Sequence, residues 1–235
     1  MSIEEKFVYE TQYSMLIDEY PDKQLFPKFY EAKKIEITLN PGDRVIIPAG
    51  WFHWVFSETD DINVAINFWY YSDFQIGNFS YRAPIKSTHN LHHEIDYMQM
   101  LNSSGEHVVT TTDTNLIPQA RVRDRFGGIN ITEEIASFEE FYTRKDPKSY
   151  IASEIDHRLM KYAPSNPSVD KLASSRWWVN WGGGITTGLH FDNEDNWLYQ
   201  LSGRKRILLF APTEYDKLYT INPYPPHLVK ALLSR

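Results

Sequence analysis

Residues 180–210 read NWGGGITTGLHFDNEDNWLYQLSGRKRILLF, which places a histidine, an aspartate and a lysine among short apolar runs. In a β-strand, residues i and i+2 face the same side, so His190 and Asp192 are expected to point into one cavity. With a histidine from elsewhere in the chain, they would form the set of two histidines and one carboxylate that binds non-haem Fe(II) and leaves coordination positions open. Taken alone, the pair also fits a surface histidine beside a solvated acidic loop.

A second histidine motif lies earlier in the chain. Residues 42–53 read GDRVIIPAGWFH: a glycine, five residues, Pro-x-Gly, two residues and then His53. A single histidine among aromatic residues also fits a hydrogen-bonded core residue. Lys205 stands between Arg204 and Arg206, which is typical of a solvated or anion-binding face. As a point charge, a lysine also suits one carboxylate deep inside a barrel.

Alternating apolar residues and turns predict strands in both outer thirds of the chain. The expected strands are 35–39, 44–47, 51–56, 62–70, 176–181, 196–201 and 204–210, with a turn at 40–43. Short helices are expected at 26–32 and 213–218. The middle, 85–172, is expected to hold helices at 91–101, 135–142 and 150–162. The pattern predicts a mainly β sandwich or barrel with added helices.

Composition excludes several classes of protein. The 235 residues carry 31 acidic and 24 basic side chains, a formal charge of −7, which argues against a nucleic-acid partner because such binding begins with phosphate neutralisation. The absence of cysteine excludes a disulfide scaffold, a thiolate zinc site and a cysteine nucleophile. The sequence shows neither a signal peptide nor an apolar run long enough to span a membrane, so a cytoplasmic protein is expected.

Taken together, the two motifs resemble a known family. Residues 42–53 fit the second cupin motif, and residues 184–190 fit the opening of the first. Asp192 stands where metal-binding cupins usually have glutamate, which is the mark of JmjC-type (cupin-8) oxygenases that use Fe(II) and 2-oxoglutarate. Residues 180–219 and 18–70 resemble the two halves of the core of the asparaginyl hydroxylases among them. The resemblance implies a double-stranded β-helix (jelly-roll) fold and a dioxygenase activity.

The same resemblance assigns roles to particular residues. His190, Asp192 and His53 would bind the iron. Lys205 would pair with the distal carboxylate of 2-oxoglutarate. The family also hydrogen-bonds this co-substrate at the positions of Thr187, Asn196 and Asn67. Aromatic residues would form a dry wall around the site, namely Trp51, Phe52, Trp69, Trp178 and Trp181.

The order of the two halves departs from the family. Here the half with His190 follows the half with His53 by 137 residues (190 minus 53). We therefore predict one circularly permuted domain over residues 1–235. Residues 1–72 would form the second half of the barrel core, 73–172 the helical and mixed segment equivalent to the family's N-terminal part, and 173–235 the first half. A fragment cut out of register from tandem copies, or two chains that exchange halves, would give the same order.

The expected reaction is hydroxylation of a C–H bond, on a protein or peptide side chain. The alternatives are a metal-binding cupin module without turnover, a phosphosugar-isomerase cupin, and an oxygenase that acts on RNA or a small molecule. A homodimer is compatible with the resemblance. Two other groups fit a solvated surface or a salt-bridged loop better than a metal or phosphate site: the cluster His89, His92, His93 and Glu94, and the basic run Arg121, Arg123 and Arg125.

Overall fold

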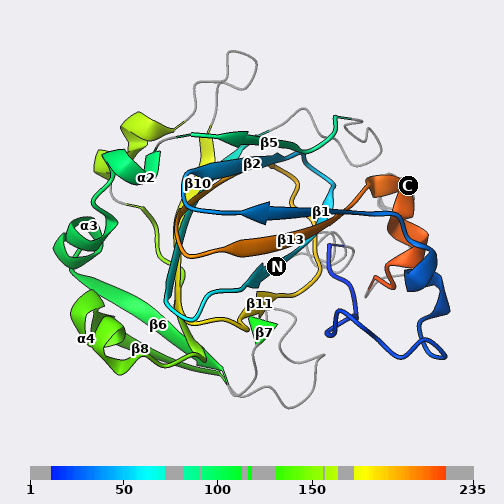
Figure 1. Cartoon of the computed structure of the whole chain (residues 1–235), viewed down its shortest axis with the longest axis horizontal. Coiled ribbons are helices and arrows are strands. Elements are labelled where there is room, and N and C mark those ends of the chain that lie inside the picture. The colour runs from blue at the N-terminus through cyan, green and yellow to red at the C-terminus, as the bar shows by residue number, and fades with distance from the viewer. Residues whose placement is uncertain are drawn as a thin grey trace, which may run out of the picture.

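A computed structural model describes residues 12–71, 82–89, 91–112, 116–117, 131–155, 157–163 and 172–220 of the chain. The strands form two β-sheets that face each other, with α-helices gathered at one side of the molecule (Figure 1). This arrangement confirms the mainly β, cupin-like architecture. The two sheets do not close into one barrel, so of the expected sandwich or barrel the chain forms the sandwich, as a jelly-roll fold does.

The elements have the following bounds. The strands are β1 (Lys34–Leu39), β2 (Asp43–Ile47), β3 (Phe52–Ser57), β4 (Ile62–Tyr70), β5 (Ile85–Thr88), β6 (Glu106–Thr112), β7 (Leu116–Ile117), β8 (Ile131–Ser137), β9 (Ser149–Ile151), β10 (Leu172–Trp181), β11 (Thr186–Thr187), β12 (Asp195–Ser202) and β13 (Lys205–Phe210). The helices are α2 (Leu91–Glu94), α3 (Tyr97–Ser103) and α4 (Phe138–Arg144), with 3-10 helices η1 (Pro27–Glu31), η2 (His157–Tyr162) and η3 (Pro212–Lys217).

Strands from the two ends of the chain pair directly with each other. The larger sheet has eight strands in the order β5-β2-β12-β4-β10-β9-β6-β8, so β4 lies between β10 and β12. The smaller sheet has five, in the order β1-β13-β3-β11-β7. Both sheets therefore need residues from the predicted first and second halves. The circular permutation itself stays a prediction.

Alternation along the strands separates three apolar clusters and leaves polar residues facing inward. On β13, Ile207 packs between the sheets, while Leu208 lies in the cluster on the outer face of the small sheet. On β4, Ile66 and Phe68 belong to the cluster that the helices cover. Because side chains alternate along a strand, Asn67 on β4 faces the opposite way, into the space between the sheets.

The middle of the chain is less helical than expected. The predicted helix at 91–101 is two short helices, α2 and α3. The helix predicted at 135–142 is present as α4 but begins at Phe138, because β8 runs to Ser137. The helix predicted at 150–162 is present only in its last part, as η2, because β9 spans Ser149–Ile151. Both strands pair with β6, which the sequence pattern missed. Pairing between distant segments supplies the hydrogen bonds that a local helical pattern does not reveal.

A capping box fixes the point where β8 ends and α4 begins. The Ser137 hydroxyl accepts from the backbone N–H of Glu140 (3.2 Å), and the Glu140 carboxylate accepts from the backbone N–H of Ser137 (2.8 Å). These bonds satisfy two helix N–H groups that would otherwise lack partners.

Ser137→Ala is therefore expected to lower the free energy of unfolding by about 1 kcal/mol. Urea unfolding followed by circular dichroism measures it. Ser137→Thr keeps a hydroxyl and should recover most of the loss. Equal destabilisation by both variants would contradict a role for the cap.

Some sequence expectations fall outside the described residues: the basic run Arg121, Arg123 and Arg125, and the Pro-rich stretch 222–226. In the part of the chain that the structure describes, no helix combines the length and the apolar character that a membrane crossing requires.

Candidate metal centre

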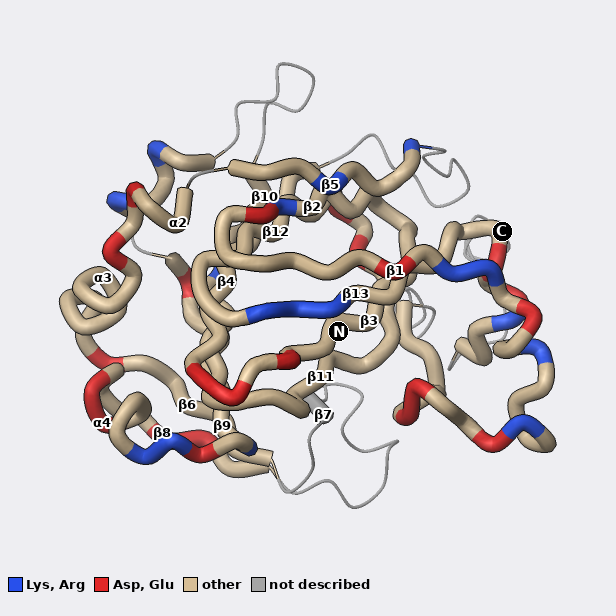
Figure 2. Tube along the Cα trace, viewed as in Figure 1, with Lys and Arg blue, Asp and Glu red and all other residues tan. Residues whose placement is uncertain are grey.

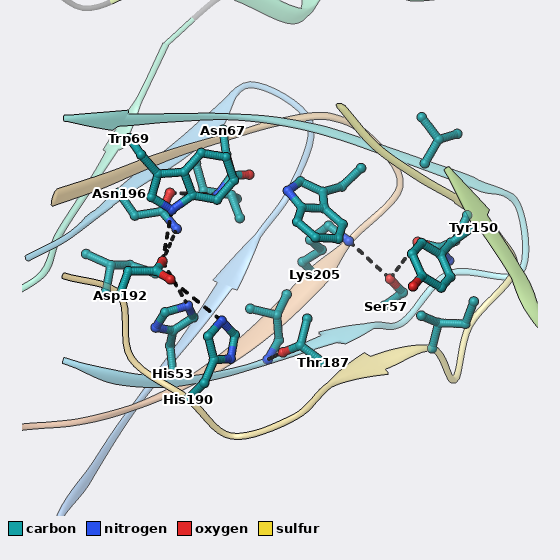
Figure 3. A pocket seen from close by; sticks show the side chains of 17 residues that line it. His53, Ser57, Asn67, Trp69, Tyr150, Thr187, His190, Asp192, Asn196 and Lys205 are labelled. Carbon is teal, nitrogen blue, oxygen red and sulfur yellow. Dashed lines mark hydrogen bonds and ion pairs between the residues drawn. The ribbon is translucent and has the colours of Figure 1, made fainter. Parts of the chain in front are cut away.

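His53, His190 and Asp192 come together at one end of the space between the sheets (Figure 3). Their ligand atoms lie within 4.8 Å of one another, and among the described residues this is the one such group of three. His53 Nε2 lies 3.6 Å from Asp192 Oδ2, and His190 Nε2 lies 4.0 Å from Asp192 Oδ1. The structure therefore assembles the three residues that the sequence motifs singled out.

A backbone bridge places the two imidazoles side by side. The N–H of His53 donates to the carbonyl of His190 (2.7 Å), and the N–H of His190 donates back (3.2 Å). Residues opposite each other across an antiparallel bridge project to the same face, and the ring centroids lie 4.2 Å apart. The pairing thus converts two motifs that are distant in sequence into one site.

Both rings present the nitrogen that a metal needs. Nδ1 of His53 lies 3.1 Å from the carbonyl of Trp51, and Nδ1 of His190 lies 2.7 Å from the carbonyl of Gly188. A carbonyl only accepts, so Nδ1 carries the proton in each neutral ring and Nε2 keeps its lone pair. Two Nε2 lone pairs and one carboxylate therefore face each other. Such a set of acceptors fits a divalent cation.

The charge states at neutral pH also suit a metal. Burial lowers the pKa of His190 to about 4, with a further contribution from His53, so the imidazole is neutral. Burial opposes ionisation of Asp192, but His53, His190 and hydrogen bonds from Trp69 and Asn196 lower its pKa below the ordinary value. Neutral imidazole and ionised carboxylate are the forms that coordinate metals.

The Pro-x-Gly turn at residues 48–50 holds the loop that carries Asp192. Gly50 has φ +82°, a conformation that suits glycine, and its N–H donates to the carbonyl of Asp192 (2.9 Å). The N–H of Ala49 donates to the carboxylate of Asp195 (3.0 Å). The turn therefore holds the start of β3 beside the residues that follow His190. This contact explains why a Pro-x-Gly turn precedes His53 in the motif.

Residues 12–16 cover the other side of His190. The Tyr13 ring stacks on the His190 ring (centroids 5.5 Å apart, interplanar angle 12°). The N–H of Ser14 donates to the carbonyl of Leu189 (2.9 Å), and the N–H of Phe191 donates to the carbonyl of Gln12 (3.0 Å). The backbone around His190 is thus hydrogen-bonded on both sides.

A cavity of about 80 Å³ runs from these three residues to Lys205. Lys205 is 5% exposed, and its Nζ donates to Ser57 Oγ (3.1 Å). Among the described residues no carboxylate forms an ion pair with it, and burial lowers its pKa to about 7. A buried amine without a counter-ion suits an anionic ligand that enters the cavity.

Strand alternation separates Lys205 from its basic neighbour. In Figure 2 the basic stretch is visible along β13. Arg206 points outward, where its guanidinium bonds Glu19 (2.8 and 2.6 Å) and Glu58 (2.8 Å). Lys205 points inward on the opposite face. Arg206, like Arg204 on the other side (3.3 Å from Glu58), therefore matches the solvated, salt-bridged alternative, and Lys205 does not.

The other three predicted co-substrate residues also line the cavity. Thr187 Oγ1 accepts from the N–H of Val55 (3.2 Å). Asn196 Nδ2 donates to Asp192 Oδ2 (3.2 Å), and Asn67 Nδ2 donates to Asn196 Oδ1 (2.6 Å). Their contact with a co-substrate remains a prediction.

Three polar residues of the cavity escaped the sequence analysis: Ser57, Tyr150 and Asn180. Ser57 Oγ donates to Asn180 Oδ1 (3.0 Å), so its hydrogen is used and it accepts from Lys205. Tyr150 reaches the site because β9 pairs with β10, opposite Asn180. No local signal could have located Tyr150, since its segment was expected to be helical.

The expected aromatic wall is only partly correct. Trp69 and Trp178 line the cavity, whereas Phe52 packs in the outer cluster of the small sheet. Trp51 and Trp181 pack against other apolar clusters. The rings of His92 and His93 lie 3.7 Å apart, and they do not form a group of three close ligands within the described residues.

A mainly β sandwich with an inward-facing set of two histidines and one aspartate is the arrangement of a cupin-type protein with a candidate metal site. A family model described as "Cupin-like domain" matches residues 3–76 and 78–231, and the chain belongs to this family. The match takes in both ends of the chain and its middle, so it covers every element described above.

Two curated relatives carry JmjC names, and a third is named for tRNA modification. A JmjC domain-containing protein of Acanthamoeba polyphaga mimivirus is 25% identical over 239 residues, covering 87% of this chain and 38% of the viral protein. Lysine-specific demethylase JMJ31 of Arabidopsis thaliana is 45% identical over 58 residues, 24% of this chain and 10% of the relative. The tRNA wybutosine-synthesizing protein 5 of Danio rerio is 54% identical over 33 residues, 14% of this chain and 10% of the relative. The chain thus spans well under half of these relatives. No solved structure matches it.

Proposed function

We propose that this protein is an Fe(II)- and 2-oxoglutarate-dependent oxygenase that hydroxylates a C–H bond. The observation that carries the proposal is the polarity of one cavity. One end gathers three acceptor ligands, His53, His190 and Asp192, and the other end holds the buried amine of Lys205. A chelating dicarboxylate would satisfy both ends at once.

Each end of the cavity has a definite role in binding. His53, His190 and Asp192 would hold the metal. Lys205 would neutralise the distal carboxylate of 2-oxoglutarate, with Ser57 fixing the direction of its Nζ. Bound iron and 2-oxoglutarate together supply the oxidising chemistry, in which one atom of dioxygen enters the substrate and 2-oxoglutarate becomes succinate and CO₂. Apolar walls from Ile185 and Leu198 would exclude water from this chemistry.

The prime substrate in this proposal is a protein or peptide side chain. The formal charge of −7 supports it over nucleic acid, because an acidic surface repels phosphate.

The two halves of the sheet sandwich would act as one domain in permuted order. The direct pairing of β4 with β10 and β12 supports that proposal.

The decisive experiment is succinate formation. Anaerobic protein loaded with Fe(II) and 2-oxoglutarate is exposed to oxygen beside Asp192→Ala. Succinate above the level of the variant, even without prime substrate, supports the proposal. Metal and 2-oxoglutarate binding without succinate would indicate a module without turnover. A protein that binds neither would contradict the proposal altogether.

Binding of 2-oxoglutarate should depend on pH through Lys205. The cation is the form that pairs with a carboxylate, and the amine has a pKa of about 7 before the ligand binds. The affinity for 2-oxoglutarate should therefore be highest below pH 7 and fall about tenfold for each pH unit above it. His190 stays neutral and Asp192 stays ionised over this range, given the directions of their pKa shifts.

Calorimetry with Mn(II)-loaded protein tests this dependence between pH 6.5 and 8.5. Buffers of different ionisation enthalpy should reveal proton uptake on binding. Lys205→Met should abolish both the uptake and the pH dependence. An affinity that stays flat across this range in the wild-type protein would rule out the linkage.

A further inference from the structure

Two side chains donate hydrogen bonds to the same oxygen of Asp192. The indole Nε1 of Trp69 lies 2.9 Å from Oδ2, and the amide Nδ2 of Asn196 lies 3.2 Å from the same atom. A carboxylate oxygen offers two lone pairs, so these bonds use both positions on Oδ2. No donor of the described residues hydrogen-bonds Oδ1, which therefore keeps both lone pairs.

The direction of these hydrogen bonds is fixed by chemistry. Ionised Asp192 only accepts, so Asn196 must turn its amide N–H toward it and its Oδ1 away. Asn67 Nδ2 then donates to that Oδ1 at 2.6 Å. The indole of Trp69 can only donate. Trp69, Asn67 and Asn196 all line the cavity, and Figure 3 shows the first two above the carboxylate.

Trp69 reaches Asp192 because of its strand position. Residues two apart on β4 share a face, so Trp69 follows Asn67 into the space between the sheets. β4 pairs with β12, where Trp69 lies opposite Asn196. The two donors to Oδ2 are thus cross-strand neighbours whose register is set by the sheet.

We propose that Trp69 is a positioning residue that, together with Asn196, fixes Asp192 as a one-oxygen ligand. Oδ1 binds the metal, and Oδ2 is held in hydrogen bonds. This inference rests on the proposed function. A carboxylate bound through both oxygens would occupy one more coordination position. Bound through one, it leaves room for the two chelating oxygens of 2-oxoglutarate and for dioxygen.

The test uses cobalt(II) as the probe, because its visible absorption reports coordination number. Trp69→Phe keeps an aromatic ring and removes only the N–H. It should weaken Co(II) binding about tenfold and change the visible spectrum as Asp192 is released to bind through both oxygens. Trp181→Phe is the matched control, since Trp181 is also partly buried but packs against the cluster under the helices and does not line the cavity.

The outcomes separate this inference from the proposed function. If the wild-type protein binds no Co(II), the result contradicts both the proposed function and this inference. If it binds and Trp69→Phe matches it in affinity within twofold and in spectrum, only the inference is overturned. Asn196→Ala removes the second donor and should shift affinity and spectrum in the same direction.

A measurement on wild-type protein covers the case in which Trp69→Phe does not fold. The indole N–H resonance of Trp69 is followed by NMR while Zn(II) is added. A downfield resonance that persists in the loaded protein supports the hydrogen bond to Asp192. A resonance at the position of a water-exposed indole overturns it.

Discussion

Lys205→Met is expected to weaken 2-oxoglutarate binding strongly while it raises the stability of the protein. Truncating one partner of a buried, hydrogen-bonded charge pair costs about 2 kcal/mol or more, which corresponds to at least about a 30-fold loss of affinity. Without ligand, the variant is expected to be more stable than the wild-type protein, because a buried amine without a counter-ion is replaced by an apolar side chain of similar length.

Two measurements on the same sample test this expectation. Calorimetry with Mn(II)-loaded protein gives the affinity at pH 6.5, where the wild-type lysine is charged. Thermal unfolding without ligand gives the stability. Lys161→Met, an exposed position on η2, should leave both unchanged. Retained affinity in Lys205→Met would contradict the assignment of Lys205 to the co-substrate.

Asp192→Ala should lower metal affinity by more than 100-fold. Loss of the hydrogen-bonding partners around a metal ligand already lowers metal affinity about 10- to 100-fold. Here the only charged ligand of the three is itself removed. Without the carboxylate, the two imidazoles bind the cation with no compensating negative charge. The variant also leaves the N–H groups of Trp69 and Asn196 without their acceptor, so a small loss of stability is expected.

Anaerobic Fe(II) or Co(II) titration measures the affinity directly. Thermal unfolding adds a second readout, since a metal that binds only the folded state raises its midpoint. Glu194→Gln is the matched control: it removes a carboxylate two residues from Asp192 that is not among the three ligands. Equal metal affinity in Asp192→Ala and wild type would show that the metal binds elsewhere.

The candidate metal site could be predicted from the sequence because each of its two motifs is local, although 137 residues separate His53 from His190 and the family resemblance was needed to join them. His190 and Asp192 are two residues apart on extended backbone, and the Pro-x-Gly turn fixes His53 at the start of β3. Short motifs with such turns constrain the backbone whatever the rest of the chain does. The strand predictions in both outer thirds succeeded for a related reason, since alternation along β1 or β13 is readable within a few residues.

The middle of the chain could not be predicted in the same way. β6, β8 and β9 owe their form to partners many residues away, as in the pairing of Val109 with Ile151. An apolar spacing compatible with a helix is then overridden by the sheet. Tyr150 was missed for this reason. The proposed role of Trp69 was missed for a different reason. Alternation along β4 predicts which way its side chain faces, but the acceptor for its indole N–H depends on the register of β4 with β12.

The cover that residues 12–16 form over His190 has a consequence for the lifetime of the protein. Removing this segment, or letting it fray, exposes one edge of the backbone that carries a metal ligand. Local opening there costs less free energy than global unfolding, and it releases the ring of Tyr13 from His190. Under the proposed function, opening of this segment and loss of the metal are therefore expected to favour each other, so a protease should cut the metal-free protein here faster than the metal-loaded protein.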